Sequence, residues 1–304
     1  MKIWLNGELV ESAGGDFPRP EQGGIAAHNV SAHSVSALSA GLNLGWGVFT
    51  TLGVRDREPR FLARHLERLG RDAKAADVPL DFDFDFAAIK SALEAVLRAN
   101  DIEQGFARLT LTRRGDGRWN RENGADFSIF VLSDLSPQNQ ENIPAIGLRA
   151  QLSPFRVEAK RALAGVKTTS YLSYLWAWRE AKARGFDEAI LRDGRDVWCE
   201  GARSSLFWMS DGELFTPSLE TGCLRGIGRD LTFEWAARQR IPFQEGHFLW
   251  HDIQSASEMW LVSAATGPRP ISALFNENSA LQREFDAKTP FCAEFSRWFE
   301  AQSE

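Results

Sequence analysis

A single lysine, Lys167, stands among apolar and small residues in the stretch LAGVKTTSYLSYLWAW (163–178). Burial of an ammonium costs on the order of several kcal/mol unless the charge is paired or neutralised, so this placement has two interpretations. In the first, the segment is a surface turn and the ammonium reaches water along its aliphatic stem. In the second, a desolvated lysine loses its proton more easily and becomes a nucleophile for a carbonyl carbon.

Glycines lead directly into a helical pattern in LRGIGRD (224–230), after a Thr-Pro turn. Free backbone N–H groups and the positive end of a helix dipole make such a junction a natural phosphate site. It is not a Walker A motif, because no GK[ST] follows. The alternative is a tight strand-to-helix turn that binds nothing.

Two charged residues have a similar double interpretation. Arg68 lies three residues after His65 in RHLERL, beside the leucines of a predicted helix. An arginine at that edge is either a surface residue or a ligand that offers its guanidinium fork to a phosphate. Glu200, in VWCEGARSSLFW, precedes a small-residue turn and is either a turn residue or an ion-pair partner.

Two other kinds of site lack essential parts. His247 and His251 have helical spacing in HFLWH, but no third ligand stands nearby and no HExxH glutamate is present, so we predict no metal site. A serine hydrolase would need a GxSxG elbow, which the sequence lacks.

The bulk composition limits the class of protein. The chain has 304 residues, 43% apolar and 25% charged, which is typical of a globular protein. A net charge of −6 argues against a nucleic-acid surface. Three cysteines without CxxC spacing indicate a reduced compartment, and no apolar run reaches the roughly 20 residues that span a bilayer. We therefore expect a cytoplasmic protein that acts on a small molecule.

The elements that must position these residues follow an α/β pattern. Strand-like segments, KIWLNGELV, VFTTLGV, ARLTLTRR and FSIFVL, alternate with two amphipathic helical patterns at 62–76 and 86–101. Further on, strands at IGLRAQL, DEAILRD, DVWCE, SSLFWM and EMWLVSA alternate with helices at 171–185, 227–239 and 285–302. A polar segment with two prolines separates these halves. We predict an N-terminal α+β domain at 1–134, a linker at 135–143 and a larger α/β domain at 144–304.

The order of these pieces resembles the class IV pyridoxal-phosphate enzymes. The series is HLERL, GVK, DEAILRD with WCEGARSSLFW, ELFTPSLETGCLRGIGRD and MWLVSAATGPRPI. That family includes branched-chain and D-amino-acid aminotransferases and 4-amino-4-deoxychorismate lyase. The likeness covers residues 2 to 271 and implies a fold-type IV enzyme with the cofactor between two domains, usually in a homodimer.

The resemblance assigns roles residue by residue. Lys167 matches the lysine that holds the cofactor as an internal aldimine, and Glu200 matches the glutamate beside its pyridine nitrogen. Arg68 matches an arginine that binds the phosphate. The remaining phosphate positions are Gly226, Ile227, Gly228, Ser263 and Ala264.

Some positions depart from the family. Gly228 and Ala264 stand where many relatives carry threonine, and together remove two hydroxyl donors to the phosphate. Each such hydrogen bond contributes about 1 kcal/mol. Gly53 stands where several relatives have a basic residue, and Ser205 replaces a common asparagine.

Several motifs favour the lyase branch, namely FTT at 49–51, LFW at 206–208, Ser263-Ala264 and the loop RRGDGR at 113–118. The carboxylates of aminodeoxychorismate need cationic hosts, for which Arg118 is the first candidate and Arg114 the second, unless this loop is merely solvated. KTTSYL, with Tyr171 close after the lysine, is more similar to the aminotransferases. The predicted function is therefore the lyase. A branched-chain or D-amino-acid aminotransferase is the alternative, and a non-catalytic relative that binds pyridoxal phosphate is the third possibility.

Overall fold

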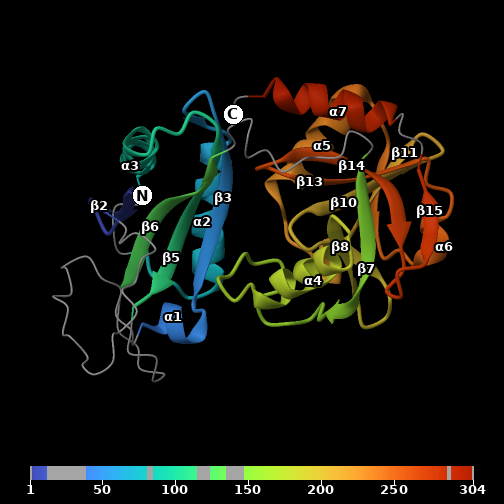
Figure 1. Ribbon diagram of the computed structural model, residues 1–304, viewed down its shortest axis with the longest axis horizontal. Helices are drawn as coiled ribbons and strands as arrows, with labels where there is room; N and C mark the ends of the chain where they lie inside the picture. The colour runs from blue at the N-terminus through green and yellow to red at the C-terminus, as the bar shows by residue number, and fades with distance from the viewer. Residues whose placement is uncertain are drawn as a thin grey trace. The chain divides into compact units, whose positions relative to one another are not determined.

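The computed structural model describes residues 2–11, 39–80, 85–114, 124–134, 147–285 and 289–302. The chain forms two compact units, each described by itself (Figure 1). The first unit contains Met1–Asn139 and Thr168–Ser170, and the second contains Gln140–Lys167 and Tyr171–Glu304. The predicted linker, 135–143, lies outside the described residues, and the predicted domain boundaries stay a prediction.

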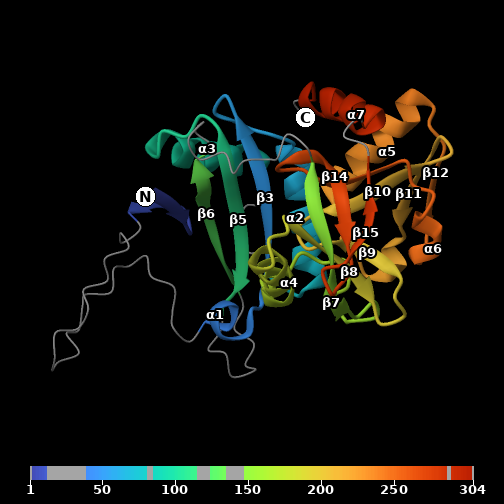
Figure 2. The ribbon, with the colours of Figure 1, turned by 45° about the vertical axis from the view of Figure 1, so that its right-hand side comes forward.

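An antiparallel sheet forms the centre of the first unit, with the strand order β2-β1-β6-β5-β3-β4. In Figure 2, its strands β3, β5 and β6 run side by side. The described strands are β1 (Lys2–Leu5), β2 (Glu8–Glu11), β3 (Gly47–Arg55), β4 (Glu58–Pro59), β5 (Gly105–Arg113) and β6 (Ala125–Asp134).

Two helices cover one face of this sheet, α2 (Leu62–Ala75) against β3 and α3 (Phe86–Ala99) against β1 and β6. A short helix, α1 (Ala40–Leu44), precedes β3. Since side chains alternate along a strand, Leu52, Leu109 and Ile129 are buried on the helical face. Thr51 and Arg108 lie on the opposite face and are partly exposed.

The N-terminal segment KIWLNGELV is a hairpin rather than one strand. Asn6 and Gly7 connect β1 to β2 with φ values of 48° and 102°. Asn-Gly is the strongest short hairpin signal, because both positions of this turn need positive φ.

The second unit is built on a mixed nine-stranded sheet with the order β12-β11-β10-β13-β14-β7-β8-β9, and β15 pairs with β14. Its described strands are β7 (Leu148–Val157), β8 (Glu188–Asp193), β9 (Trp198–Gly201), β10 (Ser205–Ser210), β11 (Glu213–Pro217), β12 (Phe243–Gly246), β13 (Glu258–Ser263), β14 (Gly267–Phe275) and β15 (Leu281–Glu284).

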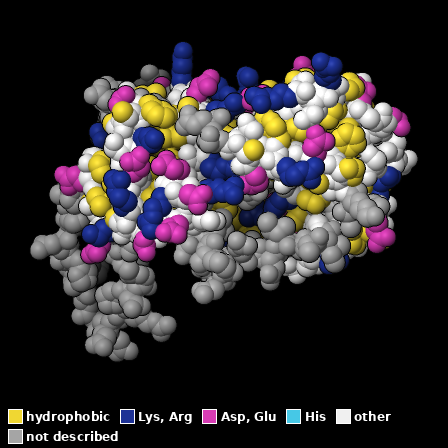
Figure 3. Space-filling view, turned by 90° about the horizontal axis from the view of Figure 1, so that it is seen from above, with side chains coloured by type: hydrophobic (Ala, Val, Ile, Leu, Met, Phe, Trp, Pro, Cys, Tyr) yellow, Lys and Arg dark blue, Asp and Glu magenta, His cyan; other side chains and the backbone are white. Residues whose placement is uncertain are grey.

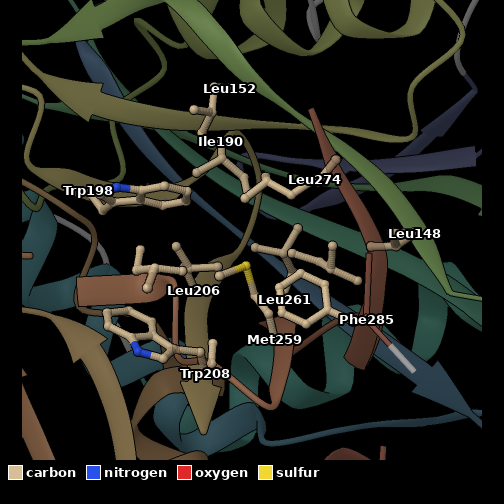
Figure 4. Packing of buried hydrophobic residues seen from close by; sticks show 14 residues of the cluster. Leu148, Leu152, Ile190, Trp198, Leu206, Trp208, Met259, Leu261, Leu274 and Phe285 are labelled. Atoms are coloured by element: carbon tan, nitrogen blue, oxygen red, sulfur yellow. The ribbon is translucent and has the colours of Figure 1, made fainter. Parts of the chain in front are cut away.

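Helices pack against different strands of this sheet: α4 contacts β7 and β8, α5 contacts β13, and α7 contacts β13 and β14. The described helices of the unit are α4 (Leu172–Ala183), η1 (Leu219–Thr221), α5 (Ile227–Gln239), α6 (Trp250–Ile253) and α7 (Pro290–Glu300). Figure 4 shows the apolar cluster at its core, where Trp198, Leu206, Trp208 and Met259 lie close together. This packing fixes the ends of β9, β10 and β13, which carry candidate site residues.

Acidic and basic side chains are interspersed on the face shown in Figure 3. Among the described residues, no helix is both long enough and apolar enough to cross a membrane.

Candidate active site

Lys167 lies at the end of a turn, with its side chain half-buried. Its Nζ atom is 4.7 Å from the centre of the Tyr171 ring. The Tyr171 hydroxyl donates to the carbonyl of Ala202 at 2.7 Å, which fixes the ring beneath the amine. Gly165, at φ 75°, brings the turn close to Cys223, since an added Cβ would lie 3.4 Å from the Cys223 carbonyl oxygen.

Glu200 is a buried residue of β9, with 6% of its surface exposed, so the turn interpretation is wrong. One carboxylate oxygen, Oε2, accepts the backbone N–H of Leu224 at 3.0 Å, and Oε1 accepts the Tyr174 hydroxyl at 3.2 Å. Loss of water raises the pKa of Glu200, while the Leu224 amide, the charge of Lys167 and the Tyr174 hydroxyl act in the opposite direction. The ionised form of Glu200 is therefore stabilised by these three neighbours against the loss of water.

Tyr174 connects Glu200 to a further cation. Arg161 donates from Nη2 to the Tyr174 hydroxyl at 2.7 Å. Tyr171 and Tyr174 stack with their ring centres 4.9 Å apart. Burial and the nearby charge of Glu200 both raise the pKa of Tyr174, which keeps its hydroxyl protonated.

The predicted glycine junction is the start of α5. Gly226 is the N-cap of this helix, and no side chain at this position bonds the first backbone N–H groups. These N–H groups therefore point outward at the helix end. An added Cβ at Gly226 would lie 3.0 Å from the Ser205 hydroxyl. At Gly228 it would lie 3.0 Å from Val262 Cγ2 and 3.1 Å from the Ser263 backbone. The absence of threonine at 228 thus has a physical cause, because the end of β13 occupies that space.

Ser263 ends β13 beside this helix start, and Ala264 follows it. The Ser263 hydroxyl lies 2.8 Å from the Thr266 hydroxyl and accepts the Thr266 N–H at 3.1 Å. Ala264 is buried, with 7% exposure. The Ser263 hydroxyl is therefore engaged in its own turn, while the Ser263 backbone contacts α5.

Arg68 belongs to the first unit, where it lies on α2 with 7% exposure, so the surface interpretation is wrong. Its Nη2 donates to the hydroxyl of Thr50 at 2.5 Å. That hydroxyl oxygen is also 2.6 Å from Nδ1 of His65, and both Thr50 and His65 are fully buried. Thr50, which is itself next to His65, thus holds the arginine in place.

Of the two arginines predicted to bind the substrate carboxylates, the structure describes only Arg114. Arg114 is half-exposed and forms an ion pair with Asp126, with 3.0 Å between Nε and Oδ1. Arg118 lies outside the described residues. Arg108 is a further candidate that was not predicted: its guanidinium lies 4.4 Å from the centre of the Phe49 ring, and its Nε donates to Thr51. The alternation in ARLTLTRR places Arg108 on the partly exposed face, which is a signal that could have identified it.

The histidine pair does not share one helix, since His247 precedes α6 and His251 is in it. His247 lies near Glu220 and His251 near Asp252. Within the described ranges, no three His, Cys, Asp or Glu side chains gather in a way that could hold a metal ion.

The second unit therefore gathers Lys167, Glu200, the start of α5 and the end of β13. These groups fit pyridoxal phosphate: an amine for its aldehyde, a buried carboxylate for its ring nitrogen and helix N–H groups for its phosphate. The glycines agree with this fit, because they let the start of α5 pack directly against Ser205 and the end of β13.

Comparison with known proteins gives a consistent result. Residues 47–274 match the family described as Amino-transferase class IV. The chain is 25% identical over 257 residues to an aminodeoxychorismate lyase of Bacillus subtilis, covering 82% of this chain and 84% of that protein. It is 25% identical over 276 residues to a branched-chain-amino-acid aminotransferase of Pseudomonas aeruginosa, covering 88% and 83%.

Solved structures agree with the sequence match. The branched-chain aminotransferase of Thermoproteus uzoniensis, solved with norvaline, superimposes with a TM-score of 0.80 at 25% identity. The similarity covers 99% of this chain and 93% of that one. With a family match over most of its length and the fold of fold-type IV enzymes, the chain belongs to the class IV aminotransferase family of pyridoxal-phosphate-dependent enzymes.

Proposed function

We propose that the protein is a 4-amino-4-deoxychorismate lyase that releases pyruvate and leaves 4-aminobenzoate. The observation that carries the choice of branch is the burial of Thr50 beside Arg68 and His65. Thr50 is the centre of the lyase-like FTT motif, where many aminotransferases have FET. A glutamate here would place a second buried charge beside Arg68, whereas the neutral threonine hydroxyl accepts a hydrogen bond from Arg68 and lies next to His65.

Each candidate residue has a role that suits its surroundings. When bound, pyridoxal phosphate supplies an aldehyde that condenses with amines and a ring that withdraws electrons from the substrate Cα. Glu200 would accept a hydrogen bond from the ring nitrogen of the bound cofactor and favour its protonated form. The Nζ amine of Lys167 would hold the cofactor through its aldehyde and, when free, would move the Cα proton of the substrate. In the second unit, the N–H groups at Gly226, Ile227 and Gly228 with the Ser263-Ala264 turn would hold the phosphate. The resemblance to the family adds Arg68 of the first unit as a further phosphate ligand.

The substrate carboxylates require cations. Arg118 and Arg114 stay candidates, and we add Arg108, which lies on the face of the first sheet opposite to α2. Stacking on Phe49 and the hydrogen bond to Thr51 restrict its rotamers, so little entropy is lost when it binds an anion.

A class IV aminotransferase acting on branched-chain or D-amino acids is the second candidate. The observation that favours it is Tyr171, which lies directly under the Lys167 amine, in a segment that departs from the lyase pattern. The two relatives named above, one of each activity, have the same identity to this chain.

The deciding experiment supplies the purified holoenzyme with aminodeoxychorismate and no amino acceptor, and measures pyruvate and 4-aminobenzoate. In parallel, L- and D-amino acids are added singly, and the absorbance of the cofactor is followed. We expect equal amounts of the two products with aminodeoxychorismate and no lasting spectral change with the amino acids.

Conversion of the cofactor to its pyridoxamine form by an amino acid, without pyruvate release from aminodeoxychorismate, would assign the protein to the aminotransferases. Cofactor binding without turnover of any of these compounds would instead support the non-catalytic relative. A homodimer is a further expectation from the family, and sedimentation of the holoenzyme checks it. A cytoplasmic location stays the expectation from the cysteine usage of the sequence.

A further inference from the structure

Tyr174 stands between a cation and the buried carboxylate of the site. Its hydroxyl oxygen accepts an N–H from Arg161 at 2.7 Å and lies 3.2 Å from Oε1 of Glu200. A hydroxyl has a single hydrogen, and a guanidinium has no lone pair that could accept it. The Tyr174 hydrogen therefore points to Glu200, and Arg161 fixes that direction.

We propose that Tyr174 and Arg161 are positioning residues that keep Glu200 ionised and aimed as the acceptor for the ring nitrogen of the cofactor. This inference rests on the proposed role of Glu200. It adds that the charge of Glu200 is maintained by a hydrogen-bonded pair behind it rather than by the cofactor alone.

The surroundings of Glu200 explain why such support is needed. The carboxylate has lost most of its water, which favours its neutral form. The Tyr174 hydroxyl donates to one carboxylate oxygen and the Leu224 amide to the other. Each oxygen keeps a further lone pair that can accept from the ring nitrogen. The other ionisable groups that act on Glu200 are Lys167, which favours the carboxylate, and the thiols of Cys199 and Cys223, which are buried and protonated.

Further contacts hold the pair in place. Arg161 also donates to the carbonyls of Glu158 at 3.0 Å and Gly222 at 3.1 Å. Gly222 is necessary for this approach: its φ is 82°, and an added Cβ would lie 3.2 Å from Nη1 of Arg161. The stacked rings of Tyr171 and Tyr174 are 11° from parallel, which restricts the hydroxyl to one position.

A small pocket of about 110 Å³ adjoins Arg161 and Tyr174. Phe155, Val157 and Leu191 contribute to its wall, but neither Lys167 nor Glu200 does. It is therefore separate from the reacting groups and lies beside the supporting pair.

The test is Tyr174→Phe in the holoenzyme, loaded with pyridoxal phosphate that carries a nitrogen isotope label in its ring. Nitrogen NMR reports directly whether the ring nitrogen is protonated. We expect the resonance to move toward the value of a neutral pyridine, and kcat/KM to fall by about tenfold, as for the loss of one hydrogen bond to a charged group. Tyr171→Phe is the matched control, because its hydroxyl bonds the Ala202 carbonyl instead, and its ring-nitrogen resonance should not move.

Arg161 is tested through a double-mutant cycle. Arg161→Met should move the resonance in the same direction. Arg161→Lys keeps a donor and a charge, so its resonance should lie closer to the wild-type position than that of Arg161→Met. If Arg161 acts through the hydroxyl, adding Arg161→Met to Tyr174→Phe should change the resonance little further. Fully additive effects, or an unchanged resonance in folded Tyr174→Phe, would overturn the proposal.

The two proposals fail separately. If the wild-type protein bound no pyridoxal phosphate, or if Glu200→Gln left its ring nitrogen unchanged, the proposed role of Glu200 would be wrong. If Glu200→Gln moved the resonance and Tyr174→Phe did not, only the supporting pair would be refuted.

Discussion

At the scale of single residues, chemistry at this site depends on an amine and a carboxylate in unusual surroundings. Lys167 is half-buried over an aromatic ring, and Glu200 is buried with hydrogen-bond donors on both oxygens. Each group keeps a charge where burial removes water, which has an electrostatic cost that an apolar residue would avoid. Retaining both groups is consistent with a functional role.

Lys167→Ala should remove the visible absorbance band of the bound cofactor and lower kcat by on the order of 10² to 10⁴-fold, since the proton-transfer group is lost. Thermal stability of the apoprotein should change little, because the side chain is only partly buried. Absorbance spectra, turnover and melting temperature check this, with Lys160→Ala as an exposed control on a nearby turn. A variant that kept the band would contradict the assignment of Lys167.

At the scale of elements, the close packing of α5 against β13 explains the glycine at 228. Gly228→Ala gains about 0.5–1 kcal/mol in helix propensity but forces its Cβ within 3.1 Å of the Ser263 backbone. Overpacking of this kind costs about 1–3 kcal/mol, so we expect a net loss of stability and weaker cofactor binding.

Urea unfolding and cofactor titration measure both effects of Gly228→Ala. Gly194→Ala is the matched control, because nothing lies within 4 Å of its added Cβ. If Gly228→Ala were more stable than the wild type, the end of β13 would be able to move aside for the added Cβ. The explanation for the missing threonine would then fail.

The start of α7 depends on a buried carboxylate of β13. Glu258, with 3% exposure, accepts the N–H groups of Phe291 at 3.1 Å and Cys292 at 3.0 Å, which the helix itself leaves unpaired. Burial raises the pKa of Glu258 despite these two donors. A favourable helix-end interaction and an unfavourable loss of water therefore act on the same group.

The sign of the resulting pH dependence follows from linkage. Because the pKa is higher in the folded protein, the native state retains the proton to a higher pH than the unfolded chain does. The contribution of this group to stability is full below the unfolded pKa, about 4.5, and is lost as pH rises through the folded value. Glu258→Gln should therefore show a smaller fall in the free energy of unfolding over that range than the wild type.

Denaturant unfolding of the apoprotein at a series of pH values measures this difference. Glu284→Gln, at an exposed position of β15 in the same unit, is the control and should leave the slope unchanged. Parallel pH profiles for the wild type and Glu258→Gln would show that the carboxylate is not perturbed.

At the scale of the whole molecule, the three cysteines report on the integrity of the second unit. Cys199, Cys223 and Cys292 are all free and buried in it. Burial raises the pKa of Cys199 to about 12 and that of Cys223 to about 11, so little thiolate is present at neutral pH.

An aromatic disulfide reagent should therefore label no cysteine rapidly in the native protein and all three after unfolding. The labelling rate in mild denaturant should follow global unfolding of this unit. Rapid labelling of one thiol in the native protein would show that its surroundings open locally.

The sequence by itself determined the local elements and the candidate site residues. The helix predicted at 227–239 is α5, and the pattern at 62–76 is α2, because helical hydrogen bonds join residues four apart and leave a periodic apolar stripe. The order of short motifs pointed to the family, which the family match confirms.

Only the tertiary structure decided which charges are buried and what surrounds them. Strand β14 was not predicted, since Pro268 and Pro270 argue against a strand, yet its position between β13 and β7 holds it in place. The links from Arg161 through Tyr174 to Glu200, and from Gly228 to Ser263, join residues that are far apart along the chain. Such contacts arise from strand pairing and side-chain packing across the fold, and no periodicity in the sequence encodes them.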